Sequence, residues 1–163
     1  MNLGFPAPDH DHAHCVADLL KRAEQACGER GLRLTPLRRR VLESLGGSHT
    51  PLGAYEIVER LAKAGEPAPP MSVYRALDFL VAERLAHRIE SKNAYLACNH
   101  GHDGGEVVMF LMCERCGTVA EVASRAVGRD LGEAARSIGF DARTQVLEIA
   151  GLCENCRKTK PKR

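Results

Sequence analysis

The sequence predicts an α+β protein: a helical N-terminal part that ends in a short hairpin, followed by a smaller mixed part cross-linked by a metal ion. Three observations in the 163 residues support this prediction. Four helix-like segments are followed by two short β-like stretches. Two C-x-x-C pairs, Cys113/Cys116 and Cys153/Cys156, come later in the chain, with 36 residues between them. That gap is long enough for a helix and a strand to fold inside the loop closed by the metal.

The cysteine pairs have the spacing of a four-thiolate zinc site. Two residues between cysteines allow a tight knuckle to direct both sulfurs at one tetrahedral ion. Turn-forming glycines accompany each pair, Gly117 after the first and Gly151 before the second. A redox dithiol and unrelated core cysteines are the alternatives. We therefore expect structural zinc at Cys113, Cys116, Cys153 and Cys156.

The composition indicates the cellular compartment of the protein but does not identify its binding partner. The seven cysteines are an odd number, and the sequence contains no apolar signal segment and no apolar run of membrane-spanning length. We therefore expect a cytoplasmic protein with reduced thiols and no membrane partner. The net charge of +2 does not indicate a nucleic-acid partner by itself. The segment 30–40 is locally basic, however, with five arginines and no acid, although a solvated helix face would look the same.

The helices are expected in this order. Residues 1–14 predict a disordered arm in which His10, His12 and His14 could chelate a metal. The first helix follows from Val16 to Gly31 and makes Cys27 a core residue. A second begins with Thr35 as N-cap and stops at Gly46 and Gly47, and a third spans residues 54–64.

The fourth helix carries the functional signal. Prolines at 67, 69 and 70 prevent an earlier start, so we expect Ser72 to cap a helix whose inward stripe leaves Tyr74, Arg75 and Asp78 outside. A hairpin of residues 87–90 and 94–97 follows, which together with the helices predicts a winged helix-turn-helix. Such a fold reads DNA with the first turn of its recognition helix. The DNA-contact candidates are Ser72, Tyr74, Arg75, Arg38 and Arg39.

The remaining segments predict a small α+β unit. We expect strands at 107–112, 118–122 and 144–150, a helix at 125–138, and a loose basic tail. A second set of soft or nitrogen ligands also remains around the junction of the two parts: His87, Cys98, His100, His102 and Glu121. A mixed set of this kind is typical of zinc, which would then tie the two parts together. A catalytic zinc would need an open position, which argues against an enzyme.

Several segments together resemble the ferric uptake regulator superfamily, and within it the zinc uptake regulators. They are LRLTPLRRRVL, AYEIVERL, SVYRALDFL, AHRIES-KNAYLAC, CERCGTVAE and GLCENC, spread over residues 15–156. The resemblance implies a winged-helix DNA-binding domain at 15–91, a hinge at 92–96, and an α+β dimerisation domain at 97–163. It also implies a homodimer that binds palindromic operators and represses zinc uptake genes when a regulatory zinc is bound, with one structural and at least one regulatory Zn²⁺ per protomer.

The regulatory ligand set is incomplete by resemblance alone. His87, Cys98 and Glu121 match three ligands, but one branch of zinc regulators has a histidine where this chain has Glu106. We favour His102 as the fourth ligand over His100 and Glu106. Sensors of iron, nickel, manganese or peroxide share the superfamily, and the thiolate of Cys98 favours zinc among these.

Overall fold

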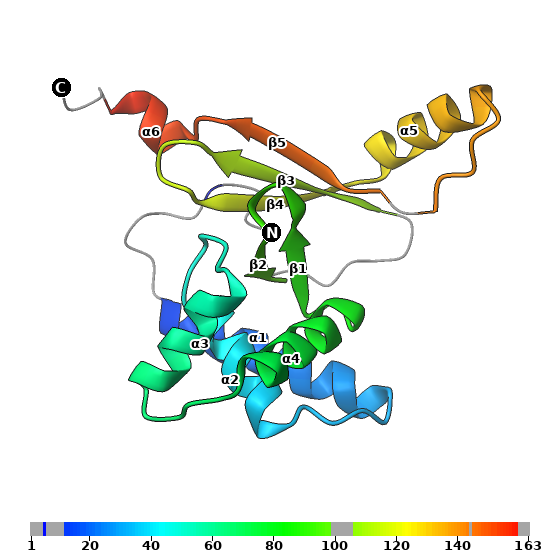
Figure 1. Ribbon diagram of the computed structural model, residues 1–163. Coiled ribbons are helices and arrows are strands. Elements are labelled where there is room, and N and C mark those ends of the chain that lie inside the picture. The colour runs from blue at the N-terminus through cyan, green and yellow to red at the C-terminus, as the bar shows by residue number, and fades with distance from the viewer. Residues whose placement is uncertain (1–4, 6–11, 99–105, 144, 160–163) are drawn as a thin grey trace. The chain divides into compact units, whose positions relative to one another are not determined.

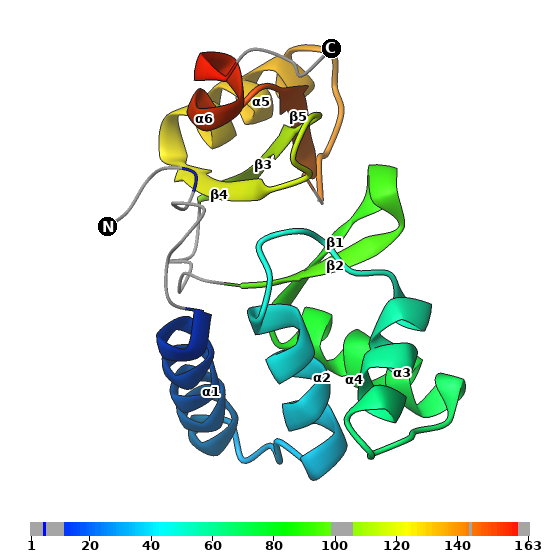
Figure 2. The same cartoon turned by 90° about the vertical axis from the view of Figure 1, so that its left-hand side faces the viewer.

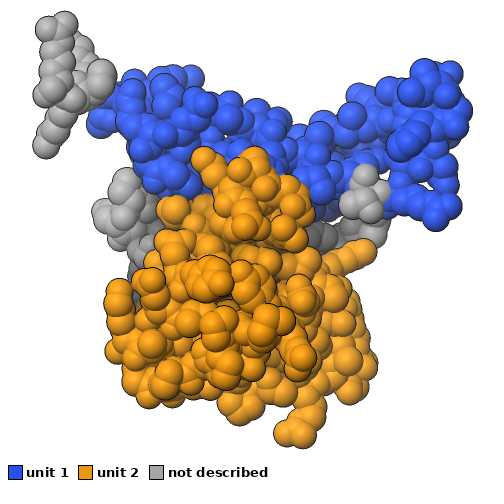
Figure 3. Space-filling model, viewed as in Figure 1, with its two compact units in different colours: residues 1–5, 100–163 blue, residues 6–99 orange. Residues whose placement is uncertain are grey.

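The computed structural model describes residue 5 and residues 12–98, 106–143 and 145–159 of the chain. It divides into two compact units, coloured separately in Figure 3. One comprises residues 6–99, which we call the helical unit, and the other comprises residues 1–5 with 100–163, which we call the sheet unit. Among the helices in the described ranges, none is long and apolar enough to cross a membrane.

The helical unit is a winged helix-turn-helix, as predicted. Its helices are α1 (His12–Glu29), α2 (Pro36–Gly46), α3 (Ala54–Lys63) and α4 (Pro70–Ala82), and Figure 2 shows α1 alongside α2. The wing is the antiparallel pair β1 (Ala86–Ile89) and β2 (Ala94–Ala97), joined by the short 3-10 turn η1 (Glu90–Lys92). Thr35 caps α2 as expected, its side chain accepting a hydrogen bond from the Arg38 amide.

Two helix starts differ from the sequence expectation. The first helix begins at His12, inside the segment expected to be a disordered arm. The fourth begins at Pro70 with Pro69 as its N-cap, so Ser72 lies inside the first turn and is not the cap. The physical reason is that proline is well suited to the first helical position, where its missing N–H costs no hydrogen bond.

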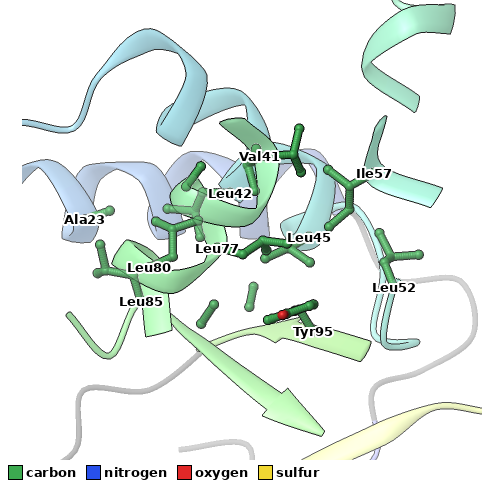
Figure 4. Close-up of a cluster of buried hydrophobic side chains, with 14 of the residues drawn as sticks. Ala23, Val41, Leu42, Leu45, Leu52, Ile57, Leu77, Leu80, Leu85 and Tyr95 are labelled. Carbon is green, nitrogen blue, oxygen red and sulfur yellow. The ribbon is translucent and has the colours of Figure 1, made fainter. Parts of the chain in front are cut away.

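One apolar core holds the helical unit together. Figure 4 shows Val41, Leu42 and Leu45 of α2 packed against Leu77 and Leu80 of α4. These side chains are almost completely buried. Cys27 is 3% exposed in the same core, which agrees with its prediction as a core residue.

The wing is fixed to this core by its second strand. Tyr95 of β2 exchanges backbone hydrogen bonds with Leu52, its amide donating at 2.8 Å and its carbonyl accepting at 2.9 Å. All four residues of β2 are buried. Residues 92–96, expected to form a hinge, are therefore part of the hairpin, and the boundary between the units falls after residue 99. Strand β2 is thus paired with β1 along one side and bridged to Leu52 on the other.

The sheet unit contains a three-stranded sheet in the order β4-β3-β5. Its elements are β3 (Val107–Cys113), β4 (Val119–Ser124), α5 (Arg125–Ser137), β5 (Leu147–Gly151) and α6 (Glu154–Lys158) (Figure 1). Strand β4 returns antiparallel to β3, whereas β5 runs parallel to β3 after the crossover through α5. The loose tail expected over residues 157–163 is corrected at Arg157 and Lys158, which belong to α6 after the second cysteine knuckle.

Candidate functional site

The four knuckle cysteines converge in the sheet unit. The first pair lies where β3 turns into β4, and the second where β5 turns into α6. All four sulfurs lie within 4.8 Å of one another, and the sulfurs of Cys116 and Cys153 are 3.9 Å apart. A tetrahedral ion with Zn–S bonds of about 2.3 Å requires sulfurs about 3.8 Å apart, whereas a disulfide would need about 2.05 Å. The donor set therefore fits a structural zinc ion.

Backbone amides donate hydrogen bonds to the sulfurs of this cluster. The Cys153 amide donates to the sulfur of Cys113 at 3.4 Å, and the Cys156 amide donates to the sulfur of Cys153 at 3.4 Å. Donation from the Cys153 backbone, together with the Cys116 and Arg115 amides, lowers the pKa of the Cys113 thiol to about 6. Burial and the neighbouring thiols raise the pKa of Cys156 to about 12. A metal cation would offset the negative charge of four thiolates held this close together.

Gly117 and Arg115 shape the knuckles. Gly117 has a φ of +76°, which favours glycine, and its amide donates to the Cys113 carbonyl at 2.9 Å. The guanidinium of Arg115 donates to the Cys156 carbonyl and, at 2.7 Å, to the Thr159 carbonyl. Arg115 therefore ties the first knuckle to the end of the second. The sequence analysis did not single it out, because its partners are backbone groups 41 and 44 residues away.

The second predicted ligand set is divided between the units. Within the helical unit, a ligand nitrogen of His87 and the sulfur of Cys98 lie within 4.8 Å of each other, close enough to share one ion. His87 comes from β1, and Cys98 directly follows β2, its amide donating to the Leu85 carbonyl at 3.0 Å. The thiol of Cys98 is 5% exposed.

The other candidates of this set lie in the sheet unit. Glu121 is on β4 opposite Phe110 and is 7% exposed, a buried carboxylate. Glu106 forms an ion pair with Arg125 at 3.2 Å, so its carboxylate is engaged elsewhere. His100 and His102 lie outside the described residues.

The first two turns of α4 present the predicted DNA-contact residues unequally. Arg75 is exposed, whereas Ser72 and Tyr74 are half-buried. The Tyr74 ring meets the ring of Tyr55, from the start of α3, edge to face with centroids 6.4 Å apart. Tyr55 is itself 67% exposed. It extends the surface of α4, and sequence spacing gave no sign of this because the two tyrosines belong to different helices.

Most of the basic segment 30–40 is used inside the helical unit. Arg39 pairs with Glu24 of α1 and with Glu43. The guanidinium of Arg38 lies 3.4 Å from the centre of the Phe79 ring and donates to the Arg33 carbonyl. Arg30 and Arg40 pair with Glu83 and Glu66. Four of the five arginines in this segment therefore make side-chain contacts within the helical unit.

Comparisons with known proteins agree on one family. The profile of the ferric uptake regulator family matches residues 29–150. The zinc uptake regulation protein of Escherichia coli is 36% identical over 139 residues, which cover 85% of this chain and 81% of that protein. A solved zinc uptake regulator complexed with zinc and DNA has a TM-score of 0.81 at 35% identity, covering 88% of this chain and 95% of the other. The solved holo XcZur has a TM-score of 0.79 at 40% identity, covering 87% and 99%.

Proposed function

The chain belongs to the ferric uptake regulator family, and from that premise we propose that it is a zinc-responsive, DNA-binding transcriptional repressor of zinc uptake genes. It acts as a regulator and not as an enzyme. The observation that carries the metal assignment is the pair His87 and Cys98, whose ligand atoms lie within 4.8 Å of each other and apart from the four-cysteine cluster. A thiolate with an imidazole suits zinc better than iron(II) or manganese(II).

The two metal sites have different tasks. Zinc held by four thiolates contributes on the order of 10–16 kcal/mol to folding, too much for an ion that must come and go with its free concentration. A site with mixed ligands from both units suits a regulatory ion that binds and dissociates as its free concentration changes. We propose that His87 and Cys98 bind the regulatory zinc together with Glu121 and with His102 or His100. Glu121 supports this because a buried carboxylate is stabilised by a cationic partner.

Zinc would act on DNA binding through linkage. If the regulatory ion binds more tightly to the arrangement of the units that fits DNA, DNA must tighten zinc binding by the same factor, typically about 1–3 kcal/mol. Ligands drawn from both units make such a preference possible, because zinc then favours one arrangement over the others. The DNA itself would be read by the first two turns of α4, with Arg75 contacting a guanine and Tyr74 and Ser72 beside it.

The surface of the sheet unit supports the proposal of a homodimer. No residue of α5 is buried, although its sequence has an apolar side. The neighbouring apolar side chains are exposed as well: Leu131, Ile138, Phe140, Val146, Ile149 and Leu152. An apolar surface of this kind, next to the edge strand β5, is what a symmetric partner copy would cover. Two copies would place two α4 helices about 34–36 Å apart on the half-sites of a palindrome.

Substitution in the interface tests the dimer. Ile138 is 81% exposed and Phe140 is 62% exposed in the single chain. Replacing both by Glu should convert the protein to monomers in analytical ultracentrifugation and strongly weaken operator binding. The helical unit should keep its melting behaviour, because neither residue belongs to it. A dimer that persists in the double variant would place the interface elsewhere.

Zinc stoichiometry tests the sensor. We would measure zinc bound per protomer, and DNA retardation, across buffered free-zinc concentrations for wild type, Cys98→Ser and the control Cys15→Ser, which alters a cysteine outside both clusters. We expect two zinc ions in wild type and control, one in Cys98→Ser, and DNA binding that requires the second ion. Two ions in Cys98→Ser, or DNA binding independent of the second ion, would contradict the proposal. Activation by iron(II) or manganese(II) in place of zinc would indicate a sensor of another metal.

A further inference from the structure

An exposed methionine stands at the tip of the helix proposed to read DNA. Met71 is the second residue of α4 and is 65% exposed. A lone exposed apolar side chain needs no explanation. Met71 is not alone, because Tyr55 and the half-buried Tyr74 form an aromatic pair at the starts of α3 and α4. The starts of α3 and α4 therefore each carry a large exposed side chain, Tyr55 and Met71, while Tyr74 packs partly against the core.

Helical spacing places Met71 in line with Arg75. Residues 71, 75 and 78 are the exposed positions between 71 and 80, and they recur at i, i+4 and i+7 along one face. The opposite face holds the buried Val73, Ala76, Leu77 and Leu80. The line ends in the carboxylate of Asp78, which DNA phosphates repel. The face is therefore best suited to approach DNA with its N-terminal end, where Met71 and Arg75 lie one turn apart.

The chemistry of the major groove supplies an apolar partner. The C5-methyl of thymine is the apolar group that base pairs present there, and apolar side chains recognise it. Methionine adapts to such a target because its thioether side chain is flexible and polarizable. Pro69 and Pro70 fix the backbone just before it, so the position of Met71 relative to the helix is set.

We propose that Met71 contacts a thymine methyl group in the operator, within one or two base pairs of the base read by Arg75. One helical turn advances about 5.4 Å, and a base pair about 3.4 Å, which gives this spacing for a helix lying in the groove. The inference rests on the proposed function, and it makes Met71 a specificity-determining residue.

The test is a double-mutant cycle between protein and DNA. The zinc-loaded protein first selects its operator from a random duplex library. Each thymine of the selected duplex is then replaced in turn by deoxyuridine, which removes only the methyl group. Binding is measured for wild type, Met71→Ala, Met71→Leu, and the control Lys21→Ala on the exposed surface of α1. Thermal melting of each variant verifies its fold, which an exposed side chain should not affect.

At one thymine per half-site, deoxyuridine should weaken wild-type binding about fourfold, the worth of burying one methyl-sized group. Met71→Ala should lose affinity for the thymine duplex by a similar factor and should not distinguish thymine from deoxyuridine there. Met71→Leu and Lys21→Ala should distinguish them as wild type does. Equal effects of deoxyuridine on wild type and Met71→Ala at every thymine, or a selected half-site without thymine, would overturn the proposal. Failure to select any duplex would instead overturn the proposed function.

Discussion

At the scale of single residues, side chains that do not bind metal fix the geometry of those that do. Arg115 lies between two knuckle cysteines and donates from its guanidinium to the carbonyls of Cys156 and Thr159. It thereby holds α6, and with it the second knuckle, against the first. Groups that orient metal ligands commonly change metal affinity by about 10–100-fold when they are removed.

We therefore predict that Arg115→Ala lowers the zinc affinity of the four-cysteine site by about 10-fold or more. The loss is measured by competition with a chromogenic chelator. The zinc affinity of Arg115→Lys should lie between those of wild type and Arg115→Ala, because an ammonium group cannot reproduce the planar fork of a guanidinium. The control is Arg129→Ala, because the exposed side chain of Arg129 pairs with the adjacent Asp130 on α5, away from the cysteines. Equal zinc affinities in Arg115→Ala and wild type would show that the hydrogen bonds of Arg115 do not contribute to metal binding.

Arg39 was a DNA-contact candidate by sequence, and its ion pairs indicate a different role. Glu24 and Glu43 are both engaged with it, on partly exposed side chains. Exposed ion pairs contribute about 0.2–1 kcal/mol each. We predict that Arg39→Ala costs the helical unit about 1 kcal/mol in denaturant unfolding and leaves the salt dependence of DNA binding unchanged. The salt dependence is the slope of the logarithm of the DNA-binding constant against the logarithm of salt concentration. If this slope became shallower by about one in Arg39→Ala, Arg39 would bind a phosphate.

At the scale of elements, the contact between α5 and β3 depends on a missing side chain. A Cβ added at Gly128 would lie 2.8 Å from Cγ2 of Val107 on β3. Valine is stiff at its first side-chain torsion, so the clash cannot be relieved cheaply. Gly132, one turn further along α5, would meet only the guanidinium end of Arg136 at 3.3 Å, which can move.

Replacing Gly128 or Gly132 by alanine should therefore change the stability of the sheet unit differently. Gly128→Ala should destabilise the sheet unit by about 1 kcal/mol, since overpacking outweighs the gain in helix propensity. Val107→Ala in the same chain should recover part of the loss. Gly132→Ala should be neutral or stabilising by up to about 1 kcal/mol. Equal stabilities of the two glycine variants in thermal unfolding would contradict a close approach at Gly128.

At the scale of the whole molecule, different interactions stabilise the two units. The helical unit has a continuous apolar core built from its helices and its wing. In the sheet unit, the helix α5 buries no residue, and a described buried cluster consists of Cys113, Cys153 and Cys156 with Phe5 packed against them. The proposed zinc ion and the proposed partner copy would supply the stability that so small a unit commonly takes from a metal or from oligomerisation.

Complete removal of zinc by a strong chelator should accordingly unfold only one unit. We predict that hydrogen exchange protection is lost in β3, β4 and β5 and is retained in α2 and α4, because structural zinc supplies folding free energy directly. Returning one equivalent of zinc should restore the protection of the sheet. Loss of protection in both units together, or in neither, would contradict this division.

The sequence by itself determined the elements and the ligands whose signals are local. Cysteine spacing identified the four-thiolate site, apolar periodicity placed the helices and the wing, and resemblance named the family. The start of α4 was misplaced because Ser72 is a good N-cap residue but lies inside the first turn, and the start of α1 because the prolines and glycine before His12 favoured an arm. The hinge was misplaced because the pairing of β2 with Leu52 joins distant parts of the chain.

Only the tertiary structure decided which polar residues are already engaged. Sequence spacing could not tell that Arg38 and Arg39 serve contacts between helices, that Arg115 joins two knuckles, or that Tyr55 meets Tyr74. The partners in each case lie on different elements, and periodicity reports only on the element that carries it. Burial, ion pairing and side-chain orientation arise when elements pack, and they separate a surface that binds DNA from one that merely faces water.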